Sequence, residues 1–97
     1  METYIVLTNY TQQGVASIKD TPARIDEGRK AVEAAGGKVL DWYLTMGHYD
    51  VVFIIQVPDS KTAATLLLAL GSQGNVHTET LRAFTEEEFR GIVAGLP

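Results

Sequence analysis

The chain contains no cysteine, only three prolines and no long apolar run within its 97 residues. Without cysteine it can form no disulfide, no thiolate metal site and no cysteine nucleophile. No apolar run approaches the ~20 residues that a membrane-spanning helix requires, and Met1 to Thr3 lacks the basic start of a secretory signal. We therefore expect a cytoplasmic protein that is not embedded in a membrane.

Positive charge is also scarce. The chain has eight lysine and arginine residues and twelve aspartate and glutamate residues, which gives a net charge of −4. This sign is unfavourable for contact with a phosphate backbone, and the sequence has no basic recognition helix, so nucleic acid is not an expected partner. A hydrophobic content of 45% with 21% charged residues is ordinary for a folded protein, and the length accommodates a single domain, residues 1–97.

The most continuously apolar segment is Val51–Val57, which follows the turn-like sequence Gly47-His48-Tyr49-Asp50. Its shortness, its β-branched residues and the Pro58 that closes it favour a strand covered on both faces over a helix. A turn that leads directly into such a strand is typical of a β-hairpin. We expect this strand to lie at the centre of a sheet.

Strand and helix patterns alternate along the rest of the chain. In chain order they are a strand Tyr4–Tyr10, a helix from Pro22 to about Ala35, a strand Lys38–Met46, the strand Val51–Val57, a helix from Asp59 to about Ser72, a strand Val76–Phe84 and a short helix after Thr85. The order β-α-β-β-α-β with a terminal helix predicts an α+β, ferredoxin-like sandwich. We expect an antiparallel sheet of strand order 4-1-3-2, with both main helices on one face.

Two helices can cover only one face of this sheet. The helix-packed face is expected to carry Trp42. The open face is expected to carry Tyr4, Thr8, Tyr43, Thr80 and Arg82 beside the apolar central strand. An apolar face of this kind needs a partner, so we expect a homodimer or a higher homo-oligomer in which two sheets pack face to face. The alternative is that the terminal helix folds back over the open face of its own subunit.

The hairpin tip, the end of the first strand and the start of the fourth strand are expected to meet at one end of the sheet. A dimer that encloses the open face would hold a mostly apolar pocket with a few hydrogen-bonding groups there, the usual form of a small-molecule site. The residues predicted for this ligand site are Asn9, Tyr10, Tyr43, His48, Tyr49, Asp50 and Arg82. The plainer interpretation is that Gly47 supplies a turn conformation and Asp50 bonds to nearby backbone.

No metal site and no cofactor are expected. His48 and His77 fall near opposite edges of the predicted sheet, three strand spacings of ~4.8 Å apart, which is too far to share an ion within one subunit. The glycines at 36, 37, 71 and 74 are predicted helix stops and do not form a phosphate-binding loop.

Four segments occur together at a regular spacing: Gly47-His48-Tyr49-Asp50-Val51-Val52, Val57-Pro58-Asp59, Gly71-Ser72-Gln73-Gly74-Asn75-Val76 and Thr78-Glu79-Thr80-Leu81-Arg82-Ala83-Phe84. Over nearly the whole chain they resemble the GYD-domain family of small bacterial and archaeal proteins. The family's Gly-x-Tyr-Asp signature falls on Gly47, Tyr49 and Asp50, with His48 at the variable position. The resemblance implies a ferredoxin-like fold of the dimeric α/β-barrel type and brings no reaction with it.

Three functions remain open at this point. The first is an oligomeric binding or sensing module whose inter-subunit pocket takes a small molecule. The second is a cofactor-free enzyme in which Tyr49, Asp50 and His48 handle a proton. The third is a purely structural, self-associating domain. They differ in their need for a cavity, since a solidly packed interface would leave only the structural function.

Overall fold

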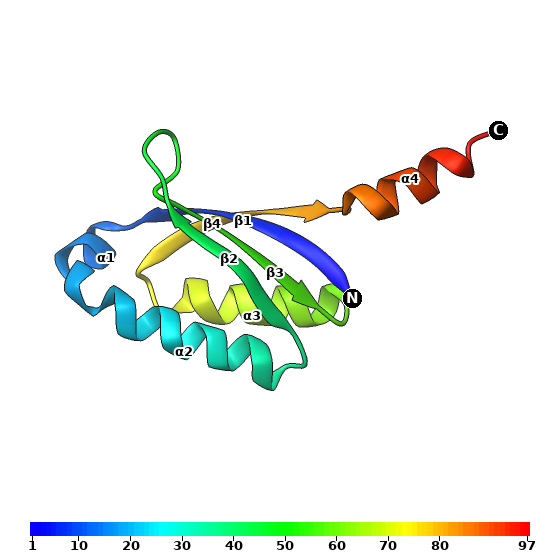
Figure 1. The fold of residues 1–97 in the computed structure, drawn as a ribbon. Coiled ribbons are helices and arrows are strands. Elements are labelled where there is room, and N and C mark those ends of the chain that lie inside the picture. Colours follow the sequence, from blue (N-terminus) through cyan, green and yellow to red (C-terminus); the bar gives the residue numbers. More distant parts are fainter.

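The computed structural model describes all 97 residues as an α+β fold with a four-stranded antiparallel sheet (Figure 1). The strands are β1 (Glu2–Tyr10), β2 (Lys38–Leu44), β3 (Val51–Val57) and β4 (Val76–Ala83). The helices are α1 (Gln12–Ala16), the short 3-10 helix η1 (Ile18–Asp20), α2 (Thr21–Ala34), α3 (Ser60–Ser72) and α4 (Glu86–Ala94). The strand order is β2-β3-β1-β4, which reads 4-1-3-2 from the β4 edge, and α2 and α3 lie on the same face (Figure 1).

Side-chain caps fix where the later helices begin. Asp59 accepts the Thr62 N–H at 2.8 Å and starts α3, and Thr85 and Glu88 form a reciprocal capping box at the start of α4. These N–H bonds favour the charged carboxylates, so the pKa values of Asp59 and Glu88 lie below their ordinary values. At the other end of α2, Gly36 has φ of 87°, a conformation that favours glycine.

The polar segment between β1 and α2 forms α1 and η1 and is held against the loop between α3 and β4. The Thr11 N–H donates to the Asn75 carbonyl oxygen at 3.0 Å, and Thr11 Oγ1 donates to the Gly74 carbonyl oxygen at 2.6 Å. A Cβ on Gly14 would lie 2.1 Å from the Asn75 carbonyl oxygen, so the close approach of these two segments requires glycine.

The core lies between the sheet and the two main helices. Its most buried side chains are Val6 and Val57, both fully buried, and Ile55, which is 1% exposed. Residues directly opposite each other in antiparallel strands point to the same face. Because Tyr4 pairs with Ile55, it lies on the helix-covered face, where it is buried.

The predicted composition of the open face is therefore wrong for four residues. Thr8 pairs with the buried Val51, and Thr80 and Arg82 pair with Val6 and Tyr4, so all of them share the helix side. The exposed side of β1 instead carries the firmly apolar pair Ile5 and Leu7. The physical reason is that the helices cover the alternate residues of β3 from Val51 to Val57, and the pairing register then fixes the face of every neighbour.

A bulge in β2 explains why both Val39 and Trp42 face the helices. Val39 pairs with Ile55 and Trp42 pairs with Phe53, although three positions separate them, because the register shifts between Val39 and Asp41. The strand ends at Leu44, two residues earlier than predicted. Simple alternation correctly placed Trp42 on the helix side but put Val39 on the wrong face.

The terminal helix α4 does not cover the open face of its own subunit. It continues from β4 away from the sheet (Figure 1), which contributes to the elongated dimensions of 52 × 31 × 18 Å. The apolar residues on and beside it are exposed, among them Phe89 at 59% and Leu96 at 64%. The longest helix, α2, has 14 residues, and none of the helices could span a bilayer.

Candidate functional site

The hairpin tip is joined to the end of β1 by the backbone and the side chain of Asp50. Its N–H donates to the Thr8 carbonyl oxygen at 2.9 Å and to Asn9 Oδ1 at 3.1 Å. Its carboxylate accepts the Tyr10 N–H, with 2.9 Å between the nitrogen and Oδ2. Since the β1–β3 ladder ends at the pair Thr8 and Val51, the Asp50 side chain continues this ladder by one further step. The carboxylate thus has a structural role.

The loop before Asp50 is shaped by two bonds of Thr45. Its N–H donates to the Asp50 carbonyl oxygen at 2.8 Å, and its Oγ1 donates to the Tyr49 carbonyl oxygen at 2.5 Å. Gly47 has φ of 155°, within the range that favours glycine, and a Cβ there would meet nothing within 4 Å. His48 is exposed in this loop.

Tyr49 reaches across the open face of the sheet to β4. Its hydroxyl donates to Glu79 Oε2 at 2.5 Å. Glu79 pairs with Leu7, so the side chain of Tyr49 passes over β1 on the side that no helix covers. The carboxylate of Glu79 holds the phenolic proton and opposes a second negative charge, which raises the pKa of Tyr49 above its ordinary value. Tyr49 is therefore a hydrogen-bond donor at neutral pH.

Replacing Glu79 by glutamine is expected to lower the pKa of Tyr49 towards the ordinary ~10. The folded-state pKa is raised above the unfolded-state pKa, so the stabilisation is present below ~pH 10 and is lost as the pH rises through the folded-state pKa. The measurement is a phenolate absorbance titration, with Tyr49→Phe identifying the contribution of this residue. Asp41→Asn, beside Tyr43, is the matched control and should leave the Tyr49 midpoint unchanged. An unchanged midpoint in Glu79→Gln would contradict the assignment.

Two other residues predicted for the ligand site also lie on the open face. Tyr43 is 56% exposed, and its hydroxyl is 3.3 Å from Asp41 Oδ1, to which it donates. Asn9 pairs with His77 of β4 at the same end of the sheet. The structure therefore brings Asn9, Tyr49 and Asp50 into one bonded group, with Tyr43 on the same face.

Tyr10 and Arg82 do not join this group. Tyr10 faces the helices and lines a cavity beneath them. Arg82 lies near the start of β1, where its guanidinium carbon is 4.5 Å from the centre of the Phe84 ring and Nε is 3.8 Å from Glu2 Oε1. Six residues of extended strand separate the two ends, or about 20 Å. Arg82 was predicted near the hairpin because its position along β4 was not resolved from the sequence.

The floor of the open face is apolar. Its members are Ile5, Leu7, Val52, Ile54 and Leu81, which pair with one another across the three strands β3, β1 and β4. No helix of this chain lies over them (Figure 1). The open sheet face therefore combines an apolar floor with the polar groups of the hairpin end.

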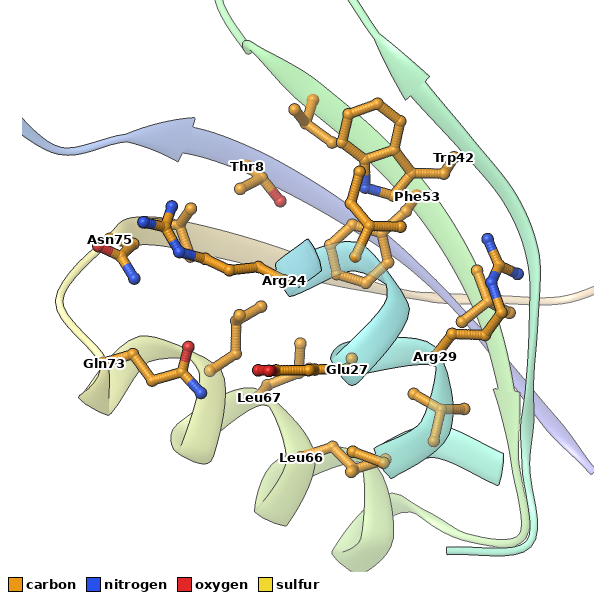
Figure 2. Close-up of a pocket in the computed structure, with 18 of the residues that line it drawn as sticks. Thr8, Arg24, Glu27, Arg29, Trp42, Phe53, Leu66, Leu67, Gln73 and Asn75 are labelled. Atoms are coloured by element: carbon orange, nitrogen blue, oxygen red, sulfur yellow. The ribbon is translucent and has the colours of Figure 1, made fainter. Parts of the chain in front are cut away.

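A cavity of about 230 Å³ lies on the opposite side of the sheet, between α2 and α3 (Figure 2). Of its 22 lining residues 14 are hydrophobic, and polar side chains such as Thr8, Arg24 and Asn75 gather towards one end. The sequence-based prediction missed this cavity. A signal was present, since Gly28 interrupts the helical stripe of larger residues on α2 and a Cβ there would meet nothing within 4 Å.

Comparison with known proteins agrees with this fold. The family profile described as GYD domain matches residues 4–93. The chain belongs to the GYD domain family. The resemblance seen in Gly47, Tyr49 and Asp50 is thereby confirmed, and the structure shows that the aspartate of this GYD domain acts on the hairpin backbone.

One relative of this GYD domain is the glutamine synthetase and cystathionine beta-lyase binding protein of Thermus thermophilus. The two are 37% identical over 84 residues, which cover 86% of this chain and 88% of the relative.

Solved structures share the fold at lower identity. The feast or famine regulatory protein from M. tuberculosis, complexed with L-methionine, matches with a TM-score of 0.66 and 18% identity over 88% of this chain. The GYD domain spans 51% of the length of that regulator. A second protein from Thermus thermophilus matches with a TM-score of 0.56 and 24% identity over 88% of this chain and 95% of its own.

Proposed function

We propose that this GYD domain is a cytoplasmic, homo-oligomeric binding module that senses a small molecule. In this arrangement two copies pack their open sheet faces together, as in a dimeric α/β barrel. The ligand occupies the polar end of the shared face. The groups that would surround it are Asn9, Tyr43, His48, Tyr49 and Asp50.

The observation that carries this proposal is the uncovered apolar floor of the sheet. Ile5, Leu7 and Ile54 lie on a face that neither main helix reaches, and α4 points away from it. A contiguous apolar face of several hundred Å² marks an interaction surface in a folded protein. A second copy supplies an identical apolar face, so the two faces cover each other around a two-fold axis.

The relatives support binding as the class of function. The relative that is 37% identical is itself called a binding protein, and its printed name gives two enzymes as its partners. Within the chain, the carboxylate of Asp50 is engaged by the Tyr10 N–H and the hydroxyl of Tyr49 by Glu79. These bonds support a role in holding the hairpin for both residues, which weighs against the enzyme alternative.

A second candidate function is binding of a partner enzyme, and the name of the Thermus relative favours it. The exposed apolar residues of α4 would provide a contact surface that remains free when two sheets are joined. Binding of purified glutamine synthetase by the protein without any added metabolite would distinguish this function from small-molecule sensing.

A thermal-shift screen against amino acids, nucleotides and central metabolites tests the first proposal. A ligand at about 100 times its Kd is expected to stabilise the protein by ~2.7 kcal/mol, which raises Tm clearly for a chain of this size. Tyr43→Ala should lose most of this shift, whereas the neighbouring Leu44→Ala, on the other face of β2, should keep it. If no metabolite raises Tm while the protein remains oligomeric, the structural alternative replaces the sensing function.

A further inference from the structure

Two buried hydroxyls line the cavity between α2, α3 and the sheet and have no hydrogen-bond partner in the protein. One is Oγ1 of Thr8, a residue that is 3% exposed, and the other is Oγ1 of Thr21 in the first turn of α2. Buried hydroxyls in folded proteins nearly always have a partner. Both belong to the same end of the fold, because β1 ends where α1, η1 and the start of α2 follow. A molecule in the cavity can accept hydrogen bonds from both.

A positive charge is present at the same end of the cavity. Arg24 lines it with a side chain that is 26% exposed. Its Nη2 donates to Ser17 Oγ at 2.6 Å and is 3.7 Å from the largely exposed Asp20 carboxylate, while Nε and Nη1 make no hydrogen bond within the protein. Figure 2 shows Arg24 extending towards Asn75, at the end where Thr8 lies. The complement of two hydroxyl donors and a guanidinium is an anionic acceptor.

The remainder of the cavity suits an apolar group. Phe53 and Trp42 form its floor on the sheet, and Leu66 and Leu67 form its wall on α3 (Figure 2). Gly28 of α2 keeps the space open, because a side chain there would project into it. Apolar cavities of roughly 150 Å³ bind benzene, so about 230 Å³ admits a somewhat larger body.

We propose that this cavity is a binding site for a small monocarboxylate with an apolar body. The carboxylate accepts hydrogen bonds from the Thr8 and Thr21 hydroxyls and pairs with Arg24. The apolar body lies between Gly28 and the aromatic floor. The site is on the opposite side of the sheet from the shared face of the proposed sensing function, so the two sites are independent.

Isothermal titration of the full chain with phenylacetate, hexanoate and phenylacetamide tests the site. Both carboxylates are expected to bind, and the uncharged amide is expected to bind at least about tenfold more weakly, since bonds to a charged group are the stronger ones. In nitrogen-correlated NMR spectra of the unmodified protein, the amide signals of Thr8, Thr21 and Arg24 should shift with phenylacetate.

Three variants locate the binding. Thr8→Val keeps the shape of the side chain and should weaken phenylacetate binding about tenfold. Gly28→Leu should fill the cavity and abolish binding. Gly71→Leu is its matched control, because a Cβ at Gly71 also meets nothing within 4 Å but Gly71 does not line the cavity. This control should bind phenylacetate as the unmodified protein does.

The proposal is overturned if neither carboxylate binds, if phenylacetamide binds as tightly as phenylacetate, or if the NMR shifts fall on the open sheet face. Binding that survives in Gly28→Leu also overturns it. A monomeric variant of the sheet face, Ile54→Asp, should still bind phenylacetate. Loss of oligomerisation with retained binding would thus separate failure of the sensing proposal from failure of this one.

Discussion

Replacing Ile54 by aspartate is expected to convert the oligomer into monomers. Ile54 pairs with Ile5 of β1 and with Asp41 of β2, so it lies within the open sheet face. In a face-to-face dimer a new carboxylate at this position would be buried without a partner, which is costly. We expect Kd for self-association to rise at least about 100-fold, or ~3 kcal/mol. Sedimentation over a micromolar concentration series measures this change.

The fold itself should survive the Ile54 substitution, because the residue faces away from α2 and α3. Circular dichroism of the Ile54→Asp protein should therefore match that of the unmodified protein. Leu68→Asp is the control, since Leu68 is a 75% exposed residue of α3 on the opposite side of the sheet. This control should remain oligomeric. An unchanged Kd in Ile54→Asp would show that the sheets do not meet face to face.

Replacing Asp50 by alanine is expected to lower the free energy of unfolding by about 1.5 kcal/mol. The Tyr10 N–H would lose a charged acceptor, and hydrogen bonds to charged groups contribute ~1.5–3 kcal/mol, with partial exposure favouring the lower value. Asp50→Asn keeps an acceptor oxygen and should cost about half as much. Urea unfolding in the Ile54→Asp background provides the measurement, because stability is then independent of protein concentration.

The control for Asp50 is Asp26→Ala on the exposed side of α2, which should change stability by less than ~0.5 kcal/mol. A catalytic role for Asp50 gives a different result. In that case Asp50→Ala would fold with unchanged stability, and the bond between its carboxylate and the Tyr10 N–H would contribute nothing measurable.

The element order was predictable because local chemistry specifies each element. Val51–Val57 is too short and too β-branched for a helix, and Asp59 and Thr85 cap the helices that follow them. The Gly-x-Tyr-Asp turn likewise indicated the hairpin. These signals act within a few residues of one another, so a single sequence contains them in full.

The assignment of faces was not predictable in the same way. The alternation in β1 separates Ile5 and Leu7 from Tyr4 and Val6, but it does not say which set meets the helices. That choice is made by pairing with β3 and by the packing of α3 over Ile55, which are contacts between distant segments. A threonine or tyrosine set can be buried when its neighbours on the same face are large and apolar.

The candidate site was partly predictable for the same reason. Asn9, Tyr49 and Asp50 meet because a hairpin tip and the end of its neighbouring strand must lie at one end of the sheet. The reach of Tyr49 to Glu79 depends on side-chain direction, which alternation alone does not give. The cavity beneath the helices depends on how far α2 and α3 lie apart, and only Gly28 hinted at it.

Light scattering of the unmodified protein at micromolar concentration tests most directly whether the open sheet face is covered by a second copy. The expected molar mass is at least twice the 10.6 kDa of one chain. A uniform species of 10.6 kDa would mean that Ile5, Leu7 and Ile54 face solvent in the working protein. That result would contradict the face-to-face assembly and remove the shared pocket with it.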